Sequence, residues 1–330
     1  MTAQAEPVIA RAPAPPPRAR LLVLDPIDAD ALGALALAHD VLVHHAPTPE
    51  ELPALVADRE VVVVRSGCRI TAEVFAAAPL LKLVLRAGSG TDNIDLDAAR
   101  RHGVRVCNTP GGSANAVAEL ALGLVLAVSR HIALADRQVR AGRWRKSELA
   151  GAELAGKVLG VVGHGAIGSR LAELGGALGM SVVTSVDRAG DERRAELAAR
   201  GARLVDLPEL LASAHVVALA VPLTDRTRGL IGPLELRAMR RDAVLVNVSR
   251  GGVVDEDALA AALAEGVIAG AGVDVHARER QSTPLAGLDN AVLTPHIGAM
   301  SSDAQRRIGE RVVADITAVL TGGEPSHPVC

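Results

Sequence analysis

The chain has 330 residues, of which 49% are hydrophobic and 22% are charged, and its formal net charge at pH 7 is -3. This length and composition are typical of a globular protein with room for two domains. The small net charge gives no reason to expect a nucleic acid or an anionic membrane as a partner. The three cysteines are scattered, which indicates neither a disulfide framework nor a metal site and fits a reducing, cytoplasmic location.

Two segments are interpreted before any fold is assigned. Residues 1–18 contain Pro-Ala-Pro-Pro-Pro and no apolar core, so we expect a disordered leader rather than a signal peptide. A proline-rich ligand for a partner domain is the alternative for this leader. The long apolar stretch from Ala114 to Ser129 is interrupted by Glu119 and is too short to span a membrane comfortably, so it predicts a buried helix.

After the leader, short apolar runs alternate with helical patterns, which favours parallel α/β sheets. The first series of predicted strands is Arg20–Leu24, Val41–His44, Val61–Arg65, Lys82–Arg86 and Val104–Val106. The second series is Val158–Val162, Val182–Val186, Arg203–Val205, Val216–Ala220, Ala243–Asn247, Gly270–Asp274 and Ala291–Leu293. A last helix, Ser301–Leu320, is expected to return to the first series.

This order of elements predicts an α/β protein with two Rossmann-like parallel-sheet domains, the first flavodoxin-like and the second doubly wound. We expect residues 19–112 and 302–330 to form a substrate-binding domain and residues 113–301 to form a dinucleotide-binding domain. Ligands of such sheets bind beyond the carboxyl ends of the strands. The sequence therefore predicts an active site in a cleft between the two domains.

A glycine-rich motif follows the strand predicted at Val158–Val162. Its spacing, Gly163-x-Gly165-x-x-Gly168, precedes a helix predicted at Ser169–Met180. Gly163 permits a tight turn, Gly165 lets the backbone approach a pyrophosphate, and Gly168 lets the helix pack close to the strand. Because strand, turn and helix arrive in this order, the motif predicts a dinucleotide site rather than a plain structural turn.

The choice of dinucleotide depends on the end of the next strand. Asp187 ends the apolar run Val182–Val186 and could accept hydrogen bonds from the ribose hydroxyls, which favours NAD. Arg188 follows directly and could bind a 2′-phosphate, so NADP remains the alternative.

Three residues near the ends of later strands could carry out hydride-transfer chemistry. His296 could supply the proton that an alkoxide needs near neutral pH. Glu279 could fix the tautomer of that imidazole and favour its protonated form. Arg250 could bind a carboxylate and polarise the neighbouring carbonyl. Each residue alone also has a purely structural interpretation. No cluster of metal-ligating residues stands out in the sequence.

Six ordered motifs resemble those of the D-isomer-specific 2-hydroxyacid dehydrogenases, from about Arg65 to the last helix. They are Arg86–Asp95, Asn108–Gly111, Gly163–Gly168, Asn247–Glu256, Gly272–Val275 and Thr294–Gly298. Within that family the chain looks most like the branch of the D-3-phosphoglycerate dehydrogenases. Since the sequence ends at Cys330, the resemblance implies a short form that lacks the regulatory extension of longer enzymes.

The resemblance also implies roles for individual residues. His296 would be the acid/base, Glu279 its partner, and Arg250 the residue that binds the keto oxygen and carboxylate. The implied substrate-binding residues are Arg65, Ser66, Gly67, Arg86, Ala87, Gly88, Arg250 and His296. The implied cofactor-binding residues are Gly163, His164, Gly165, Ala166, Ile167, Gly168, Asp187, Arg188, Val221, Pro222, Thr227, Val248, Ser249, Arg250, Asp274, His296 and Gly298. In this set Asp274 would face the nicotinamide carboxamide, and the resemblance further implies a homodimer through the nucleotide domain.

The chain departs from the family pattern at two places. His276 stands where the family usually has phenylalanine, and Arg280 stands where it usually has proline. Either these residues pack or face solvent, or they reshape the site for an unusual anionic substrate. Arg65 and Arg86 would suit a second anion on the substrate, such as a phosphate or phosphonate.

Several functions remain open at this stage. The default substrate pair is D-3-phosphoglycerate and 3-phosphohydroxypyruvate, with phosphonopyruvate, hydroxypyruvate and glyoxylate as alternatives. A nucleotide-sensing protein similar to the corepressors of this family is an alternative from another class. Formate oxidation is a third, against which Glu279 counts, since that branch usually lacks the glutamate.

Overall fold

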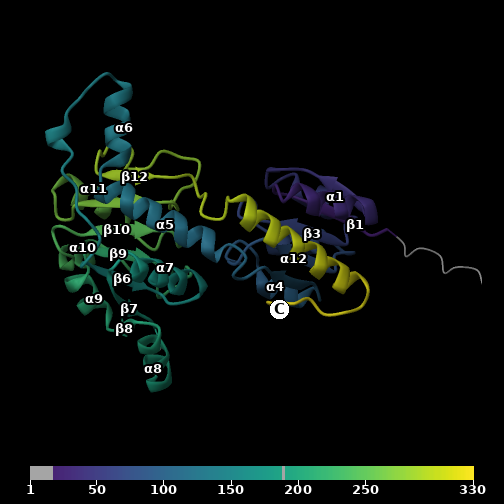
Figure 1. The fold of residues 1–330 in the computed structure, drawn as a ribbon. Coiled ribbons are helices and arrows are strands. Elements are labelled where there is room, and N and C mark those ends of the chain that lie inside the picture. Colours follow the sequence, from purple (N-terminus) through teal and green to yellow (C-terminus); the bar gives the residue numbers. More distant parts are fainter. Residues whose placement is uncertain (1–17, 188–189) are drawn as a thin grey trace, which may run out of the picture. The chain divides into compact units, whose positions relative to one another are not determined.

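The computed structural model describes residues 18–187 and 190–330 and contains two parallel-sheet units (Figure 1). The predicted leader, apart from Arg18, and Arg188 lie outside the described residues. The first unit comprises the described residues up to Arg86, with Asn93–Cys107 and Val312–Cys330. The second comprises Ala87–Asp92 and Asn108–Arg311. Residues 87–92, 108–112 and 302–311, which the sequence assigned to the first domain, thus fall in the second unit.

The described part of the first unit contains a five-stranded sheet in the order β2-β1-β3-β4-β5. Its strands are β1 (Arg20–Val23), β2 (Asp40–Val43), β3 (Val61–Val64), β4 (Leu83–Arg86) and β5 (Arg105–Asn108). Its helices are α1 (Ala29–Ala38), α2 (Leu52–Val56), α3 (Ala72–Ala76) and α4 (Leu96–Arg101), with the second half of α12 (Ser302–Leu320). The parallel strand pairs and the order, with β1 inside the sheet, confirm the predicted class.

The second unit contains a seven-stranded sheet, among the described residues, in the order β12-β11-β10-β9-β6-β7-β8. Its strands are β6 (Val158–Val162), β7 (Ser181–Ser185), β8 (Ala202–Leu204), β9 (Val216–Leu219), β10 (Val244–Asn247), β11 (Gly270–Val273) and β12 (Ala291–Leu293). Its helices are α5 (Ala114–Ser129), α6 (Ile132–Arg140), η1 (Lys146–Glu148), α7 (Ala166–Ala177), α8 (Asp191–Ala199), α9 (Leu207–Ser213), α10 (Pro233–Ala238) and α11 (Glu256–Ala264). The strand order reverses beside β6, as in a doubly wound sheet.

Two apolar cores cover the faces of this sheet. On one face, α5 and α7 pack against the strands and bury residues such as Ala121, Leu124 and Leu171. On the other face, α9, α10 and α11 bury residues such as Leu210 and Leu259. The apolar stretch predicted as a buried helix is α5, and eight of its residues are buried. In the described part of the chain no single helix is long and apolar enough to cross a membrane, and α5 and α6 pass only as a pair bent by 63°.

Two helices differ from their predicted bounds, and the smaller difference is at α12, which begins at Ser302 rather than Ser301. The helix expected at Ser169–Met180 is α7, which begins three residues earlier and ends at Ala177. It begins at once after the glycine turn, so that its first amides lie at the turn itself. It ends because Gly179 adopts φ +79°, a left-handed conformation that terminates a helix.

Candidate active site

The parallel pairing of the second sheet brings the predicted site residues to one edge. In register, Val162 lies beside Leu219, Leu219 beside Asn247, Asn247 beside Val273, and Val273 beside Leu293. The loops that follow these strands carry the glycine motif, Arg250, Asp274 and His296. Because the strands are parallel, their carboxyl ends and these loops lie at the same edge of the sheet.

Two glycines of the motif are required by the protein itself. Gly163 adopts φ +90°, and a Cβ there would lie 2.5 Å from the carbonyl oxygen of Ala220. A Cβ at Gly168 would lie 2.0 Å from the carbonyl oxygen of Gly163. Both distances are too short for a side chain, so these positions fix the turn and the close packing of α7 on β6.

Packing inside the protein does not explain the middle glycine of the motif, Gly165. Gly165 is exposed, has φ -84°, and a Cβ there would meet no atom of the described part of the chain within 4 Å. The fold therefore does not itself require glycine at this position. The open space lies at the first turn of α7, which no side chain of residues 18–187 or 190–330 caps. Amides at the start of a helix, beside open space, are what an approaching phosphate needs, so these residues fit the pyrophosphate of a dinucleotide.

The rest of the glycine loop is held by α8. His164 is buried, and its carbonyl oxygen accepts a hydrogen bond from Nη2 of Arg193 at 2.6 Å. Burial and the nearby guanidinium groups of Arg193 and Arg200 lower the pKa of His164. Ala166 is exposed and Ile167 is half-buried at the start of α7.

Asp187 lies exposed after β7 and is paired with an arginine, and its predicted contact with a ribose stays a prediction. Its carboxylate forms an ion pair with Nη1 of Arg226, at 2.9 Å to Oδ2 and 3.2 Å to Oδ1. Arg226 lies after β9 in the same loop as Val221, Pro222 and Thr227, whose hydroxyl donates to the carbonyl of Pro222 at 2.6 Å. Sequence reasoning missed Arg226, because nothing in its local pattern shows that it contacts a residue 39 positions away.

His296 and Glu279 form the pair that the sequence predicted. Nδ1 of His296 lies 2.5 Å from Oε1 of Glu279. The hydrogen bond to His296 lowers the pKa of Glu279 although burial opposes the shift, and the charges of His296, His276 and Arg280 add to the lowering. A carboxylate on Nδ1 leaves Nε2 of the imidazole to face a substrate, which is the arrangement of a general acid with its orienting partner.

Asp274 holds the loop that carries His296. Its buried carboxylate accepts hydrogen bonds at Oδ1 from the Thr294 hydroxyl, 2.6 Å, and from the Ile297 amide, 2.8 Å. Oδ2 accepts from the Gly298 amide at 2.9 Å, and the Asp274 carbonyl accepts from the His296 amide at 2.8 Å. These bonds fix a loop in which His296 has φ +56°, an uncommon conformation for a non-glycine residue. In the structure Asp274 therefore supports the loop of His296, while its predicted contact with a nicotinamide stays a prediction.

Arg250 is oriented by a second carboxylate. Its Nε donates to Oδ1 of Asp92 at 3.0 Å, and its Nη1 donates to the Ser249 carbonyl at 2.8 Å. A Cβ at Gly90 would lie 1.8 Å from Nη2 of Arg250, so glycine is needed for the guanidinium to lie there. Asn247 shapes the turn, since its side-chain oxygen accepts from the amide and hydroxyl of Ser249, which is buried like Val248. Asp92 and Asn247 lie inside the motifs quoted from the sequence, but their contacts were not predicted.

His276 packs against the loop of His296. Its Nε2 lies 3.1 Å from the carbonyl oxygen of Thr294, while Nδ1 is buried with no hydrogen-bond partner among the described residues. This contact favours the packing interpretation of His276 over a direct role in binding substrate. Arg280 is exposed and adopts φ +65°.

The remaining substrate-binding predictions fall in different units. Ala87 and Gly88 belong to the second unit, whereas Arg65, Ser66, Gly67 and Arg86 belong to the first. In the first unit the carboxylate of Asp25 accepts from the Arg65 amide at 2.6 Å, and a Cβ at Gly67 would meet that carboxylate. Burial lowers the pKa of Arg65, with Asp25 opposing the shift, and Arg86 is buried at the end of β4.

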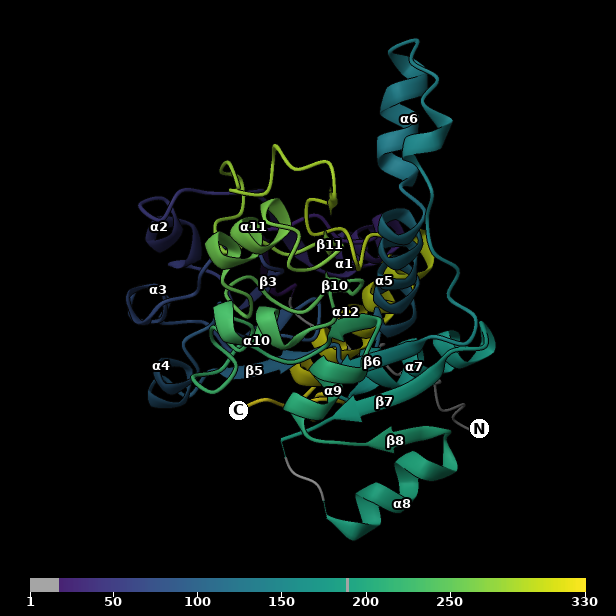
Figure 2. The same ribbon diagram turned by 90° about the vertical axis from the view of Figure 1, so that its left-hand side faces the viewer.

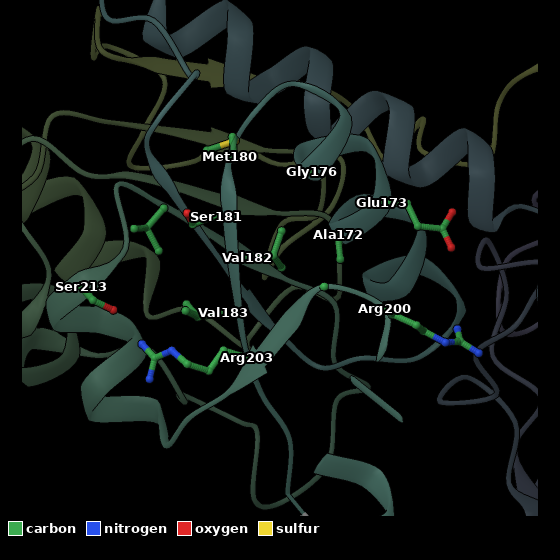
Figure 3. Close-up of a pocket in the computed structure, with 12 residues that line it drawn as sticks. Ala172, Glu173, Gly176, Met180, Ser181, Val182, Val183, Arg200, Arg203 and Ser213 are labelled. Atoms are coloured by element: carbon green, nitrogen blue, oxygen red, sulfur yellow. The ribbon is translucent and has the colours of Figure 1, made fainter. Parts of the chain in front are cut away.

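A cavity of about 420 Å³ lies elsewhere in the second unit (Figure 3). It is lined by the second half of α7, the start of β7 and residues around β8, including Glu173, Arg200 and Arg203. Val158 and Ser181 are the first residues of β6 and β7, so this cavity is at the amino ends of the strands. No predicted site residue lines it, so it is separate from the site described above.

The fold and the glycine loop together define a dinucleotide-binding protein of the doubly wound class. Residues 122–298 match the D-isomer specific 2-hydroxyacid dehydrogenase, NAD binding domain. The chain therefore belongs to the D-isomer specific 2-hydroxyacid dehydrogenases, a family of NAD(P)-dependent oxidoreductases.

The relatives differ in how much of their length the chain covers. It is 41% identical over 305 residues to the D-3-phosphoglycerate dehydrogenase of Methanocaldococcus jannaschii, covering 92% of this chain but 58% of that protein. It is 40% identical over 305 residues to the hydroxypyruvate reductase of Thermotoga maritima, covering 91% of this chain and 97% of that protein. The crystal structure of the TT0316 protein from Thermus thermophilus has a TM-score of 0.87 and 37% identity, covering 94% of this chain and all of that one.

Proposed function

We propose that the protein interconverts a short anionic D-2-hydroxy acid and its 2-keto acid with NAD(H) or NADP(H). The observation that carries this proposal is the hydrogen bond of 2.5 Å between Nδ1 of His296 and Glu279. It gives the edge of the sheet an oriented imidazole in the loop after β12, and β11 separates β12 from β10, whose loop carries Arg250. These are the groups that reduction of a 2-keto acid needs.

Each residue of the site has its own role in the proposed reaction. When bound, the reduced nicotinamide supplies hydride to C2 of the keto acid. His296 donates a proton to the oxygen of that carbon as negative charge develops on it, and Glu279 stabilises the imidazolium. Arg250, fixed by Asp92, binds the keto oxygen and the carboxylate. The amides at Gly165 to Gly168 bind the pyrophosphate and keep the dinucleotide at this edge.

The default substrate of the proposal is 3-phosphohydroxypyruvate, with D-3-phosphoglycerate in the reverse direction. The identity to several D-3-phosphoglycerate dehydrogenases supports it, as does the sequence position of Arg65 and Arg86. A second candidate is hydroxypyruvate or glyoxylate. It is favoured by one observation: the hydroxypyruvate reductase of Thermotoga maritima is matched over nearly its whole length, while the phosphoglycerate dehydrogenases are matched over 58% or less.

The test is steady-state oxidation of NADH and of NADPH with a panel of 2-keto acids. The panel contains 3-phosphohydroxypyruvate, phosphonopyruvate, hydroxypyruvate, glyoxylate and pyruvate. We expect a doubly anionic acid to have the highest kcat/KM, and Arg65→Ala to lower it selectively. A preference for hydroxypyruvate or glyoxylate, unchanged in Arg65→Ala, would support the second candidate.

Two variants test the mechanism itself. His296→Ala removes the proton donor, and Arg250→Lys replaces a planar fork by a point charge. We expect each to lower kcat by about 10²-fold or more. Full turnover in both variants would contradict the proposed mechanism and would favour the nucleotide-sensing alternative.

We also propose that the second unit forms a homodimer through α6 and the segment after it. In Figure 2, α6 projects away from the sheet. Ile132, Val139 and Trp144 are large apolar side chains that are exposed there, Trp144 to 83%. A cavity of about 520 Å³ lies between α6 and residues 143–151. Exposed apolar surface of this kind is typical of a protein interface.

The sequence provides a direct probe of this interface. Trp144 is the only tryptophan, so its fluorescence reports one site. We expect its emission to shift to shorter wavelength as the protein concentration rises, in step with dimer formation measured by sedimentation. A Trp144→Arg variant should be monomeric. If a dimer forms but Trp144 keeps the emission of a solvent-exposed tryptophan at every concentration, the interface lies elsewhere.

A further inference from the structure

The segment that carries Glu279 has no regular secondary structure. It runs from His276, just after β11, to Thr283, and Arg280 within it adopts φ +65°, which is uncommon for a residue with a side chain. Such a conformation persists only where surrounding contacts impose it. The position of Glu279 beside His296 therefore depends on what holds the two ends of this segment.

Glu256 holds both ends. Its Oε1 accepts a hydrogen bond from the Ala277 amide at 2.5 Å, and its Oε2 accepts from the Thr283 hydroxyl at 3.2 Å. Ala277 lies two residues before Glu279 and Thr283 lies four residues after it. One carboxylate thus closes the segment into a loop with Glu279 inside it.

Glu256 is itself rigidly placed. It is the first residue of α11, and the Asp255 side chain caps that helix by accepting from the Ala258 amide at 3.0 Å. The Asp255 amide donates to the Ile231 carbonyl at 3.0 Å, and Leu259 and Leu263 anchor α11 in the core. An acidic residue in the first turn also suits the positive end of the helix dipole.

The same stretch of chain contacts the segment at a second point. A Cβ at Gly251 would lie 1.9 Å from the His276 carbonyl oxygen and 2.8 Å from the Ala277 amide nitrogen. The backbone at 276–277 therefore packs directly on Gly251, the neighbour of Arg250. Residues 250–256 consequently carry Arg250 at one end. At the other end, Glu256 supports the segment of Glu279.

We propose that Glu256 is a positioning residue for the acid–base pair. It acts through the segment 276–283, which it holds so that Oε1 of Glu279 stays 2.5 Å from Nδ1 of His296. This inference rests on the proposed function of that pair. It assigns Glu256 no contact with substrate.

The test compares Glu256→Ala, Glu256→Gln, Glu279→Gln and the double variant Glu256→Ala/Glu279→Gln. For keto-acid reduction, we expect Glu256→Ala to lower kcat by about 10-fold or more with little change in KM. The high-pH limb of its rate profile should move toward lower pH, in the same direction as in Glu279→Gln. Glu256→Gln keeps an oxygen for the Ala277 amide and should recover most of the rate.

The double variant separates positioning from general damage. If Glu256 acts through Glu279, the double variant is within about twofold of Glu279→Gln alone, since interacting residues are not additive. Asp257→Ala is the matched control, because Asp257 is also an acid in the first turn of α11 and is exposed. It should leave kcat and the pH profile unchanged.

Thr283→Val serves where Glu256→Ala fails to fold. It removes the hydrogen bond to Oε2 and leaves Glu256 in place, so we expect a smaller shift of the pH limb in the same direction.

Each contrary outcome has one meaning. In the first, Glu256→Ala lowers kcat without moving the pH profile, and the double variant loses the product of the two single losses. That result would overturn the inference and give Glu256 a structural role only. An effect of Glu279→Gln without any effect of Glu256→Ala or Thr283→Val would also overturn it and leave the proposed function intact. If Glu279→Gln and His296→Ala were both inert, the proposed function would fail and this inference with it.

Discussion

Two regions at the same edge of the second sheet are built in opposite ways. The glycine loop between β6 and α7 takes its shape from the backbone, through the close contacts at Gly163 and Gly168. The loops after β10, β11 and β12 take theirs from carboxylates that accept hydrogen bonds from distant residues, namely Asp92, Asp274 and Glu256. We call the glycine-loop region the cofactor end and these three loops the chemical end. The contact of Gly168 with Gly163 is local in sequence and that of Gly163 with Ala220 is not, so the cofactor end depends partly on local sequence, whereas the chemical end depends on tertiary contacts.

The largest effect is expected at Asp274, where the chemical end has its most buried support. Asp274→Ala leaves the part-buried Thr294 hydroxyl and Ile297 amide and the buried Gly298 amide without their acceptor, at a cost of about 1–3 kcal/mol for the buried amide and less for the other two. Because His296 then loses its position, we expect kcat to fall by about 10²–10⁴-fold. Urea unfolding and steady-state kinetics measure both losses.

The control at this site is Thr294→Val, which removes one of the three bonds and should fall between wild type and Asp274→Ala. An Asp274→Ala enzyme with wild-type kcat would show that the loop keeps its shape without the carboxylate. The contrast between the two regions would then disappear.

Glu279→Gln is expected to have the next largest effect, about 10²-fold in kcat at neutral pH, because the imidazolium loses its charged partner. The pKa of Glu279 is lowered in the folded protein, mainly by its hydrogen bond to His296. The ionised form of Glu279 therefore stabilises the fold. This contribution is complete at pH values above the ordinary pKa of 4.5 and is lost as the pH falls through the lowered pKa.

Unfolding at two pH values checks this sign. The difference in unfolding free energy between wild type and Glu279→Gln should be larger at neutral pH than below the ordinary glutamate value. A difference that grows on acidification would mean that the ionised carboxylate is not stabilising in this pair.

Two substitutions in the glycine loop should have different effects, one on stability and the other on cofactor binding. Gly168→Ala places a Cβ 2.0 Å from the Gly163 carbonyl and should cost about 1–3 kcal/mol of stability. In Gly165→Ala the new Cβ meets no atom of the described residues within 4 Å, so the stability of this variant should stay within about 0.5 kcal/mol of wild type. Its affinity for NAD or NADP, measured by calorimetry, should nevertheless fall about tenfold because the pyrophosphate is kept away. Unchanged affinity in Gly165→Ala would contradict the placement of the phosphates.

The smallest effect is expected at Arg226, where the cofactor end also depends on a tertiary contact. The ion pair neutralises Asp187 and offers a guanidinium beside it, which favours acceptance of a 2′-phosphate. Arg226→Ala should raise the ratio of the Kd for NADP to that for NAD by several-fold. An exposed ion pair contributes about 0–1 kcal/mol, so stability should barely change. Arg228→Ala on the same loop is the control, and an unchanged ratio in Arg226→Ala would exclude the pair as a determinant.

The sequence by itself determined the architecture and most of the site's members. Apolar runs and glycines are local signals, so β6 and β12 were predicted with their observed bounds and the glycine turn with its geometry. Arg250, Glu279 and His296 were chosen by residue chemistry and family motifs, and the structure brings Glu279 to His296.

Only the tertiary structure decided which carboxylate serves which group. Asp274 supports the loop of His296, Asp187 pairs with Arg226, and Glu256 holds the segment of Glu279, and none of these contacts was predicted. The expected contacts of Asp274 with a nicotinamide and of Asp187 with a ribose stay predictions. The physical reason is that an acidic side chain looks the same in sequence whether it binds a ligand, a solvent molecule or a distant amide. Its partner is fixed by where the folded chain places donors, and such a donor lies 20 residues away for Asp274 and 158 residues away for Asp92.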